Sequence, residues 1–437
     1  MKKSSKRFLS MVLALALALP AATGLAGCGG SGESTAVASG GTAADTSAGQ
    51  SVETKKEPVE ITVWSHLVEN TEVPALKKVA EEWAAETGNK VKVLFDATSF
   101  QSYTQAANSS KGLDIMYGFA NDNLGLFETA KLLDDVPDGL VTPEKYAQGS
   151  IDAVTINGKQ VAVPIATENM ALFYNTEKVQ TPPATWDELV EKAKEVGFMV
   201  DLTSLYRVWP FISGKGGYTY KLSYGKYDIN DLGLGEPSKE GYALINQLVN
   251  EYKFMKADCN EAISVGNFKN GKIGFYIGGP WDIANFQSQS NLKFAVAPLP
   301  KIDGKDMKTF LGVQTAFVNS KSPNKEVAWE LVKYLAENSG IPIYKAGNRV
   351  PALLSDLENP EFKSDKLLSS FAEQAKVGEP LPNIPEMADT WQSYVDNIKL
   401  LITNKISLDQ MVEKMDKEIR KKNSDRNSSA TEASATK

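Results

Sequence analysis

Residues 59–95, VEITVWSHLVENTEVPALKKVAEEWAAETGNKVKVLF, decide the fold class of this 437-residue chain. The stretch opens with a strand pattern over 59–64 and closes with alternating apolar and basic residues over 90–95. Between them, four apolar residues recur at i, i+3, i+4 and i+7, as on one face of a helix: Leu76, Val79, Ala80 and Trp83. Thr87-Gly88-Asn89 ends this helix. A strand, a helix and a strand in this order indicate a parallel α/β sheet.

Strands and helices continue to alternate in the rest of the chain. We predict further strands near 113–117, 160–165, 170–174, 272–277 and 291–297. One helix is expected after Thr185, which forms a capping box with Glu188, and another after Ser322-Pro323. Three more helices should cover 365–376, 391–402 and 408–422. This order favours two α/β lobes between which the chain crosses several times, a division that spacing alone does not prove.

The N-terminal residues 1–27 have the features of a secretory signal peptide. Four basic residues precede position 8, an apolar run covers 8–20, and small residues follow. The run is shorter than the roughly 20 residues of a membrane-spanning helix. Leu25-Ala26-Gly27-Cys28 resembles the lipobox of bacterial lipoproteins, so we expect Cys28 to become the lipidated N-terminus. The alternative is an ordinary signal peptide followed by a coincidental cysteine.

A linker and a tail flank the folded part. Residues 28–57 should form a flexible linker behind the lipidated cysteine, because twenty of residues 29–57 are Gly, Ser, Thr or Ala. Residues 423–437 are rich in Ser, Asn and Ala, and we expect a disordered tail there. The folded part is then about 58–422, anchored to the outside of the cell membrane. With Cys28 lipidated, Cys259 has no disulfide partner.

The composition excludes several classes of function. A formal net charge of −7, and of −11 without the basic signal peptide, argues against nucleic acid as a partner. One His and two Cys are too few for most zinc sites, and a Ser-His-Asp triad would have to use His66. We therefore expect no metal, no cofactor and no catalytic residue.

Individual motifs give little support for catalysis. Residues 266–273, GNFKNGKI, come close to a phosphate-binding loop, but Ile273 stands where that loop needs Ser or Thr. A helix end turning into a strand explains them better. His66 follows the first strand, at the edge of a parallel sheet where ligands bind, although a lone His there is more often a loop residue. A glycoside hydrolase remains a distant alternative, because no pair of carboxylates stands out.

The seven tryptophans point to carbohydrate. Three lie on helical stripes or in a helix first turn and are expected in the core: Trp83, Trp186 and Trp329. Four lie at strand ends or loop edges beside Pro or Gly: Trp64, Trp209, Trp281 and Trp391. A sugar ring has apolar faces that stack on aromatic side chains and a rim of hydroxyls that bind carboxylates and amides. Loop tryptophans can equally fill the core between two lobes.

Longer runs resemble a known family. These are 216–221 (GGYTYK), 225–231 (GKYDIND), 267–271 (NFKNG), 279–281 (GPW), 322–326 (SPNKE) and 382–387 (PNIPEM) followed by Trp391. In this order they resemble the bacterial extracellular solute-binding proteins of ABC sugar importers, and among them the maltose/maltodextrin-binding proteins. The resemblance extends over nearly all of 58–422. It implies a monomer that closes like a hinge on a sugar and delivers it to ABC permease subunits in the membrane.

The resemblance also implies domain boundaries and binding residues. Lobe 1 would comprise 58–166 and 312–355, and lobe 2 would comprise 167–311 and 356–422. Five positions match sugar-binding residues of the family: Trp281 and Trp391 as stacking rings, Tyr206 as a binding tyrosine, Glu168 at the hinge strand and Asp122 in a loop of lobe 1.

Some family positions in lobe 1 are altered. The loop after the first strand reads Leu67-Val68-Glu69-Asn70 instead of carrying an Asp-Lys pair, so Glu69 joins His66 as a candidate contact. Phe119 lies in the region of the family's lobe 1 tryptophan, and Asn123 stands where an arginine is usual.

Lobe 2 departs from the family in its polar residues. Ser204 replaces a sugar-binding Glu, and Gln392 and Val395 replace a Tyr and an Arg near Trp391. Because polar contacts set specificity more than apolar ones, maltose itself is in doubt. Malto-oligosaccharides, longer or branched α-glucans among them, are the expected ligands, and a different oligosaccharide is the alternative.

Overall fold

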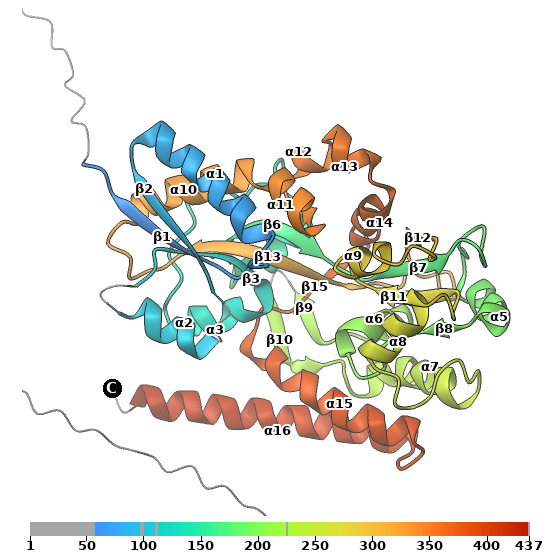
Figure 1. Ribbon diagram of the computed structural model, residues 1–437. Coiled ribbons are helices and arrows are strands. Elements are labelled where there is room, and N and C mark those ends of the chain that lie inside the picture. Colours follow the sequence, from blue (N-terminus) through green and yellow to red (C-terminus); the bar gives the residue numbers. More distant parts are fainter. Residues whose placement is uncertain (1–56, 97–99, 110–111, 224–225, 436–437) are drawn as a thin grey trace, which may run out of the picture. The chain divides into compact units, whose positions relative to one another are not determined.

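The computed structural model describes residues 57–96, 100–109, 112–223 and 226–435 (Figure 1). Cys28, the signal peptide and nearly all of the predicted linker lie outside these ranges. The described chain builds two larger sheets, of seven and four strands, each with its own buried core. We call the part around the seven-stranded sheet lobe 1 and the part around the four-stranded sheet lobe 2.

Lobe 1 is a mixed sheet between two layers of helices. Its strands are β1 (Glu60–Ser65), β2 (Lys90–Phe95), β3 (Ile115–Ala120), β6 (Val163–Glu168), β13 (Phe310–Val318), β14 (Val350–Pro351) and β15 (Glu379–Pro380). Its helices are α1 (Glu72–Thr87), α2 (Phe100–Ala107), η1 (Asn121–Asn123), α3 (Leu124–Thr129), α4 (Gln148–Ala153), α10 (Lys325–Asn338), α11 (Gly340–Gly347) and α12 (Leu354–Leu357), with a small hairpin of β4 (Thr155–Ile156) and β5 (Lys159–Gln160). Helices α1, α10 and α11 cover one face, and α2 and α3 the other (Figure 1).

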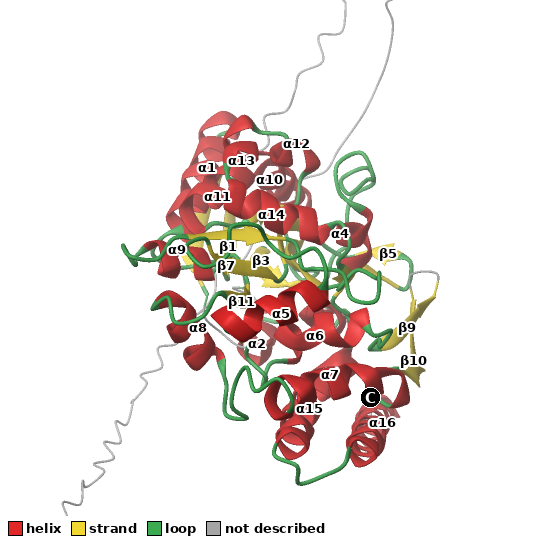
Figure 2. Cartoon of the chain, turned by 90° about the vertical axis from the view of Figure 1, so that its right-hand side faces the viewer, coloured by secondary structure: helices red, strands yellow, loops and turns green. Residues whose placement is uncertain are grey.

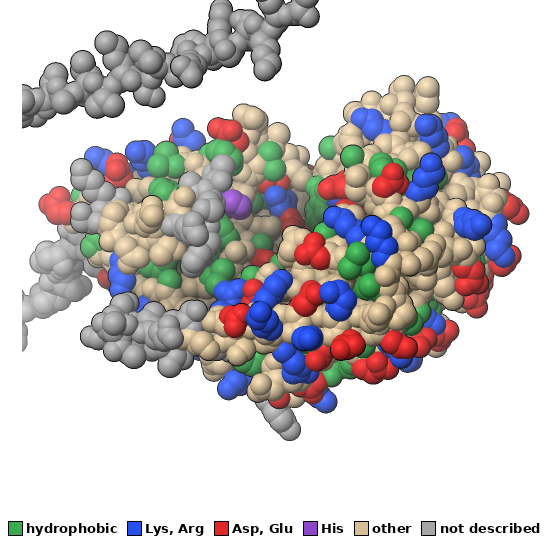
Figure 3. All heavy atoms as spheres, turned by 90° about the horizontal axis from the view of Figure 1, so that it is seen from below, with side chains coloured by type: hydrophobic (Ala, Val, Ile, Leu, Met, Phe, Trp, Pro, Cys, Tyr) green, Lys and Arg blue, Asp and Glu red, His purple; other side chains and the backbone are tan. Residues whose placement is uncertain are grey.

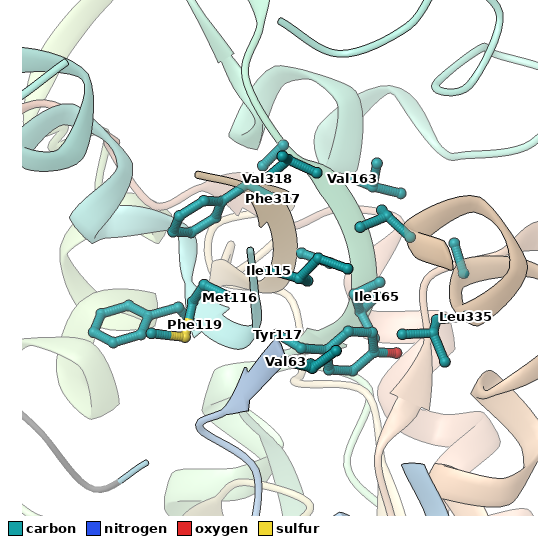
Figure 4. Close-up of a cluster of buried hydrophobic side chains, with 14 of the residues drawn as sticks. Val63, Ile115, Met116, Tyr117, Phe119, Val163, Ile165, Phe317, Val318 and Leu335 are labelled. Atoms are coloured by element: carbon teal, nitrogen blue, oxygen red, sulfur yellow. The ribbon is translucent and has the colours of Figure 1, made fainter. Parts of the chain in front are cut away.

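The core of lobe 1 is built around strands β3, β6 and β13, which are buried on both faces. Figure 4 shows side chains from β1, β3, β6 and β13 meeting Leu335 of α10, among them Val63, Ile115 and Phe317. The side chains of these three residues and of Leu335 are fully buried. The hydroxyl of Tyr117, in the same cluster, forms a hydrogen bond of 2.6 Å with Ser339 Oγ, so this polar group is satisfied inside the core.

Lobe 2 is a smaller sheet covered by helices on both faces. Its strands are β7 (Ala171–Asn175), β8 (Phe198–Met199), β11 (Phe275–Gly278) and β12 (Phe294–Ala297), and a separate hairpin holds β9 (Tyr220–Ser223) and β10 (Lys226–Leu232). Its helices are α5 (Trp186–Val196), α6 (Leu205–Gly214), η2 (Glu236–Ser238), α7 (Lys239–Asn250), α8 (Glu261–Lys269), α9 (Asp282–Gln287), α13 (Pro360–Ser364), α14 (Lys366–Ala375), η3 (Pro385–Met387), α15 (Ala388–Ile402) and α16 (Leu408–Ala435). Helices α9 and α14 lie on one face, and α5, α6 and α7 on the other (Figure 2).

The chain crosses between the two sheets at neighbouring places. Strand β6 ends at Glu168, and only Asn169 and Met170 separate it from β7 of the other sheet. Strand β13 brings the chain back from lobe 2 and pairs antiparallel with β6, with Gly312 opposite Glu168. Strand β15 pairs in parallel with the first residues of β13. The crossing strands are therefore hydrogen-bonded to one another.

The local sequence patterns are confirmed. Strand β1 pairs in parallel with β2 and β3, as the strand–helix–strand pattern predicts. Helix α1 ends at Gly88, whose backbone is left-handed with a φ of 78°. The capping box holds, because Thr185 Oγ1 accepts from Glu188 N and Glu188 Oε2 accepts from Thr185 N, both at 3.3 Å. Cys259 is a buried free thiol.

Two expectations are wrong. Trp209 is not a loop residue: it is fully buried in α6, which continues through Pro210, and it stacks on Phe310 with 4.4 Å between ring centroids. The disordered tail expected from 423 is not found over 423–435, because α16 runs to Ala435. Asn423 is buried and donates to the Tyr220 hydroxyl at 3.1 Å, and Arg426 pairs with Asp389, so the start of this segment is fixed to lobe 2.

Asp356 of α12 gives a testable pH dependence of stability. Its Oδ2 atom is buried and has no hydrogen-bond partner among the described residues, and burial raises its pKa to about 6 from 3.8. The folded protein thus binds a proton more tightly than the unfolded chain, and the free-energy cost of this carboxylate is present above pH 6 and absent below pH 3.8. Asp356→Asn should raise the free energy of unfolding by about 1 kcal/mol near neutral pH, less than the full conversion of the shift because the group is partly exposed.

The measurement is urea unfolding of wild type and variant at about pH 7.5 and about pH 4. The gain should disappear at the lower pH. Asp138→Asn, which removes the same charge from an exposed loop position, is the control and should change little at either pH. An equal gain at both pH values would contradict the assignment to Asp356 titration.

Candidate functional site

A pocket of about 430 Å³ lies where the crossing strands meet the loops of both lobes. Figure 3 shows the hollow, with the only histidine of the chain at its edge. The lining residues come from six separate stretches of the sequence: His66, Val68, Glu72, Phe119, Ala120, Asn123, Glu168, Pro280, Trp281, Gln314, Gly347, Asn348 and Arg349. Its volume is in the range of small-molecule binding sites.

The lobe 2 wall of the pocket is aromatic. Strand β11 ends at Gly278, and a short turn carries Pro280 and Trp281 before α9 begins. The Trp281 side chain is 42% exposed, which is unusual for so large an apolar group. Gly279 makes this arrangement possible, because a Cβ there would come within 2.4 Å of the Trp281 ring. The turn therefore presents an open indole face.

A buried charge network supports Trp281 from behind. The Arg207 guanidinium lies 5.8 Å from the centroid of the Trp281 ring, within the range of a cation–π contact. This buried Arg donates to the Tyr276 hydroxyl and to Glu261, and it lies 3.6 Å from Asp282. Burial raises the pKa of Asp282, although Arg207 opposes the shift. Tyr276 donates to Asp282 Oδ2 at 2.8 Å, so the network is closed around the tryptophan.

The lobe 1 wall is polar, and its arginine is placed by a helix end. Helix α11 ends at Gly347, and Asn348 takes the left-handed conformation with a φ of 56°, returning its N–H to Tyr344 O. This αL cap turns the chain into β14 and directs it past α1. Arg349, the residue after the cap, lines the pocket with its side chain 17% exposed.

Two carboxylates hold Arg349. Glu72 accepts from Nε at 2.8 Å and from Nη2 at 3.2 Å, and its side chain is 1% exposed. Glu168, at the end of β6, accepts from Nη1 and also from Gln314 Nε2 at 3.2 Å. The guanidinium thus connects α1 with the crossing strand. Bidentate pairing of this kind fixes the orientation of the arginine.

His66 and Phe119 form the remaining part of the lobe 1 wall. Their ring centroids are 4.6 Å apart. The His66 Nδ1 atom lies 2.9 Å from the carbonyl oxygen of Asp96, which can only accept, so Nδ1 carries the hydrogen. The other ring nitrogen, Nε2, is then an acceptor in neutral His66.

The pocket brings together five of the nine candidate binding residues: His66, Phe119, Asn123, Glu168 and Trp281. Two others lie at the crossing strands, just outside the lining. The Tyr206 hydroxyl donates to the Glu168 carbonyl at 3.0 Å, and it is close enough to Asp122 for that carboxylate to help raise its pKa. Burial raises the pKa of Asp122, which accepts from Asn123 Nδ2 at 2.8 Å.

The last two candidates also lie outside the lining. Trp391, in the first turn of α15, is half-buried and packs edge-on against Phe310, with 6.1 Å between ring centroids. Glu69 is exposed and does not line the pocket, although Val68 beside it does. Trp64 packs against the core of lobe 1. Among the tryptophans expected at loop edges, Trp281 is the one that lines this pocket.

Sequence reasoning missed the polar residues that hold the arginine. Glu72 reads as the first residue of an amphipathic helix, and Arg349 lies 277 positions later. Gln314 lies within the buried strand β13. Two signals were available: Arg349 is a charged residue directly before the apolar strand β14, and Gln314 is a polar residue inside the apolar strand β13. Both signals are weak, because many residues of these kinds simply lie at the protein surface.

The wall chemistry defines what the pocket can bind. An open indole face opposite hydrogen-bond donors and acceptors suits a ring with apolar faces and a polar rim. In the described ranges, no cluster of three or more His, Cys, Asp or Glu could hold a metal ion. No helix there is long and apolar enough to span a bilayer.

Comparison with known proteins identifies relatives over most of the chain. The bacterial extracellular solute-binding protein family matches residues 78–370. The galactooligosaccharide-binding protein of Bacillus subtilis (strain 168) is 28% identical over 386 residues, which are 84% of this chain and 90% of that protein.

Solved structures agree in fold. The maltose-maltodextrin binding protein of the thermoacidophilic bacterium Alicyclobacillus acidocaldarius is 35% identical, with a TM-score of 0.74 over 83% of this chain and 100% of that one. A cyclo/maltodextrin-binding protein complexed with maltotetraose is 26% identical, with a TM-score of 0.79 over 85% of this chain and 98% of that one. The predicted two-lobe α/β fold is therefore confirmed.

Removal of Arg207 should destabilise the protein. Arg207→Met leaves the buried Asp282 and Tyr276 without their charged partner, and breaking a buried pair costs about 3 kcal/mol of unfolding free energy. Arg420→Met, which breaks an exposed pair with Asp416, is the matched control and should cost less than about 1 kcal/mol. Urea unfolding followed by circular dichroism measures both values. Equal losses in the two variants would show that the Arg207 network does not stabilise the fold.

Proposed function

Because this chain belongs to the bacterial extracellular solute-binding protein family, we propose that it captures malto-oligosaccharides between its two lobes and delivers them to an ABC importer. The observation that carries the proposal is the pocket itself, with Trp281 exposed on one side and Arg349, Glu168 and Asn123 on the other. The structural relatives that bind maltodextrins and maltotetraose support the choice of α-glucans.

The two walls match the two surfaces of a sugar ring. The apolar C–H face of a glucose unit stacks on the Trp281 indole, and its hydroxyl rim meets the polar side chains of lobe 1. Tyr206, Asp122 and Trp391 lie close to the crossing strands and would extend the site along a longer chain when the lobes close. This arrangement favours oligosaccharides over single sugars.

A second candidate ligand class is galacto-oligosaccharides. The relative that binds them covers more of this chain than the family pattern does, at 84% of its length. The altered polar positions, such as Asn123 and Ser204, also favour a rebuilt rim. The two classes share apolar ring faces and differ in the orientation of hydroxyls, so only the polar wall separates them.

We propose that the protein binds its ligand without cleaving it. Glycoside hydrolysis uses two carboxyl groups that flank the scissile bond. The two carboxylates of this pocket, Glu72 and Glu168, instead both engage one guanidinium on the same wall. Product chromatography after incubation with maltotetraose should show unchanged oligosaccharide, and product that increases with protein concentration would favour the hydrolase.

The test of function is calorimetric titration of the purified chain with maltotriose, maltotetraose and galacto-oligosaccharides. We expect saturable binding of the α-glucans and a change in tryptophan fluorescence. Trp281→Ala should weaken binding by about 1–3 kcal/mol, or roughly 5- to 150-fold, because the stacking face is lost. Leu222→Ala, at a residue 40% exposed in the β9–β10 hairpin, is the control and should bind normally.

The outcomes separate the candidates. Saturation by galacto-oligosaccharides with no response to α-glucans would transfer the assignment to the second class. Absence of binding to every tested oligosaccharide would remove the proposal. Normal α-glucan affinity in Trp281→Ala would be consistent with the proposed function but would show that Trp281 does not stack on the sugar.

We also propose that the chain is a lipoprotein anchored to the outside of the cell membrane through Cys28, and that it acts as a monomer. The support is the lipobox at 25–28, which follows an apolar run and precedes a segment rich in small residues. An anchor of this kind keeps the binding protein close to the importer.

Cys28→Ser should release the protein from the membrane. Without the thiol no lipid can be attached, so the variant should lose incorporation of labelled palmitate and appear in the culture medium. Cys259→Ser, at the buried thiol, is the control and should remain with the membrane. Membrane retention and palmitate labelling of Cys28→Ser would contradict the anchor.

A further inference from the structure

Glu72, a buried glutamate at the start of α1, is not among the binding residues that the sequence predicts. The Glu72 side chain is 1% exposed, yet it borders the pocket. Its Oε2 atom accepts from the backbone N–H of Val68 at 2.8 Å, and both its oxygens accept from Arg349. A carboxylate is buried at high cost unless it is paired, so the pairing with Arg349 is what keeps Glu72 in this position.

The packing around Glu72 leaves it no alternative place. A Cβ on Gly347 would lie 1.8 Å from Glu72 Oε1, so the end of α11 needs a residue without a side chain at this point. Asn348, next to it, turns the chain in the left-handed conformation. Together these two residues bring the backbone of Arg349 close enough for its side chain to reach Glu72.

Arg349 retains hydrogen-bonding capacity toward the pocket. A guanidinium has five N–H groups. Within the described structure, Nε and one N–H of Nη2 serve Glu72, and one N–H of Nη1 serves Glu168. One N–H on each of Nη1 and Nη2 remains, on a side chain that lines the pocket. Beside them, Glu168 accepts from Arg349 with Oε1 and from Gln314 with Oε2. Each carboxylate oxygen has a second lone pair that can accept another hydrogen bond.

We propose that Arg349 is a ligand-contacting residue that selects neutral sugars, and that Glu72 is the positioning residue that fixes it. The two free N–H groups donate to the oxygens of two neighbouring hydroxyls, and Glu168 accepts a hydroxyl hydrogen beside them. A hydroxyl satisfies both groups because it donates and accepts. An acidic sugar would instead meet two carboxylates against one guanidinium, which is a net negative wall. This inference rests on the proposed oligosaccharide function.

The test is a double-mutant cycle on maltotetraose binding, measured by calorimetry. Arg349→Ala should weaken binding roughly 10- to 100-fold, because hydrogen bonds to a charged group are lost. Arg349→Lys should recover only part of this loss, since an ammonium cannot serve Glu72 bidentately and the ligand together. Glu72→Gln should weaken binding in the wild-type background and add nothing in Arg349→Ala, because Glu72 acts through Arg349.

Controls separate positioning from a general loss of structure. Glu81→Gln changes an exposed glutamate of the same helix, α1, that does not line the pocket, and it should leave affinity unchanged. If Glu72→Gln does not fold, Gly347→Ala replaces it, because the added Cβ displaces Glu72 from Arg349. Galacturonic acid trimers supply the charge arm: wild type should bind them far more weakly than maltotriose.

The results distinguish this inference from the function it rests on. Absence of oligosaccharide binding in wild type would remove the proposed function and this inference with it. Wild-type affinity in Arg349→Ala, in a protein whose Trp281→Ala variant has lost binding, would overturn the inference alone. Equal losses from Glu72→Gln in both backgrounds would restrict Glu72 to a structural role.

Discussion

The antiparallel pairing of β6 with β13 is the constraint on which the rest of the structure depends. Both strands belong to the lobe 1 sheet: the chain leaves for lobe 2 at the end of β6 and returns at the start of β13, so the backbone hydrogen bonds between them hold the two crossings together. Glu168 is the last residue of β6, and its carbonyl accepts from the Tyr206 hydroxyl of α6. The junction therefore ties a lobe 2 helix to the strand that delivers a pocket carboxylate. A change in the orientation of the lobes would act directly on the pocket, because Glu168 belongs both to the junction and to the pocket lining.

Each lobe contains an arginine that is paired with carboxylates, but the two arginines have different roles. Arg207 in lobe 2 is 5% exposed, engages Glu261, Tyr276 and Asp282, and lies 5.8 Å from the centroid of the Trp281 ring. Arg349 in lobe 1 is held by two carboxylates and keeps its outer edge in the pocket. Buried charges are tolerated only when paired, and a remaining N–H can serve a ligand only where the side chain lines the pocket. Arg349 lines the pocket and Arg207 does not, so Arg207 supports an aromatic surface and Arg349 supplies a polar one.

Local patterns predicted the elements well, and non-local contacts account for what they missed. The helix stripe ending at Gly88 and the Thr185 capping box depend on residues within a few positions of one another, and both are present. The Glu72–Arg349 pair joins residues 277 positions apart, which no periodicity records. Trp209 was misjudged because the neighbouring Pro210 reads as a helix breaker, although α6 accommodates it. The segment from 423 is polar, and its anchors, Tyr220 and Asp389, lie elsewhere in the sequence.

Trp281 and the Arg349 cluster lie on different lobes, and this placement bears on the proposed closure of the lobes on a ligand. A ligand shifts an equilibrium between open and closed arrangements only by its difference in affinity for the two. A molecule without hydroxyls leaves the polar groups around Arg349 without partners, and one without an apolar face leaves the Trp281 ring uncovered, so neither makes all the contacts that the two walls offer. A sugar ring presents both surfaces at once. Under the proposed function, closure would be coupled to molecules that satisfy both walls, and selectivity would follow from where the side chains lie on the two lobes connected at β6 and β13.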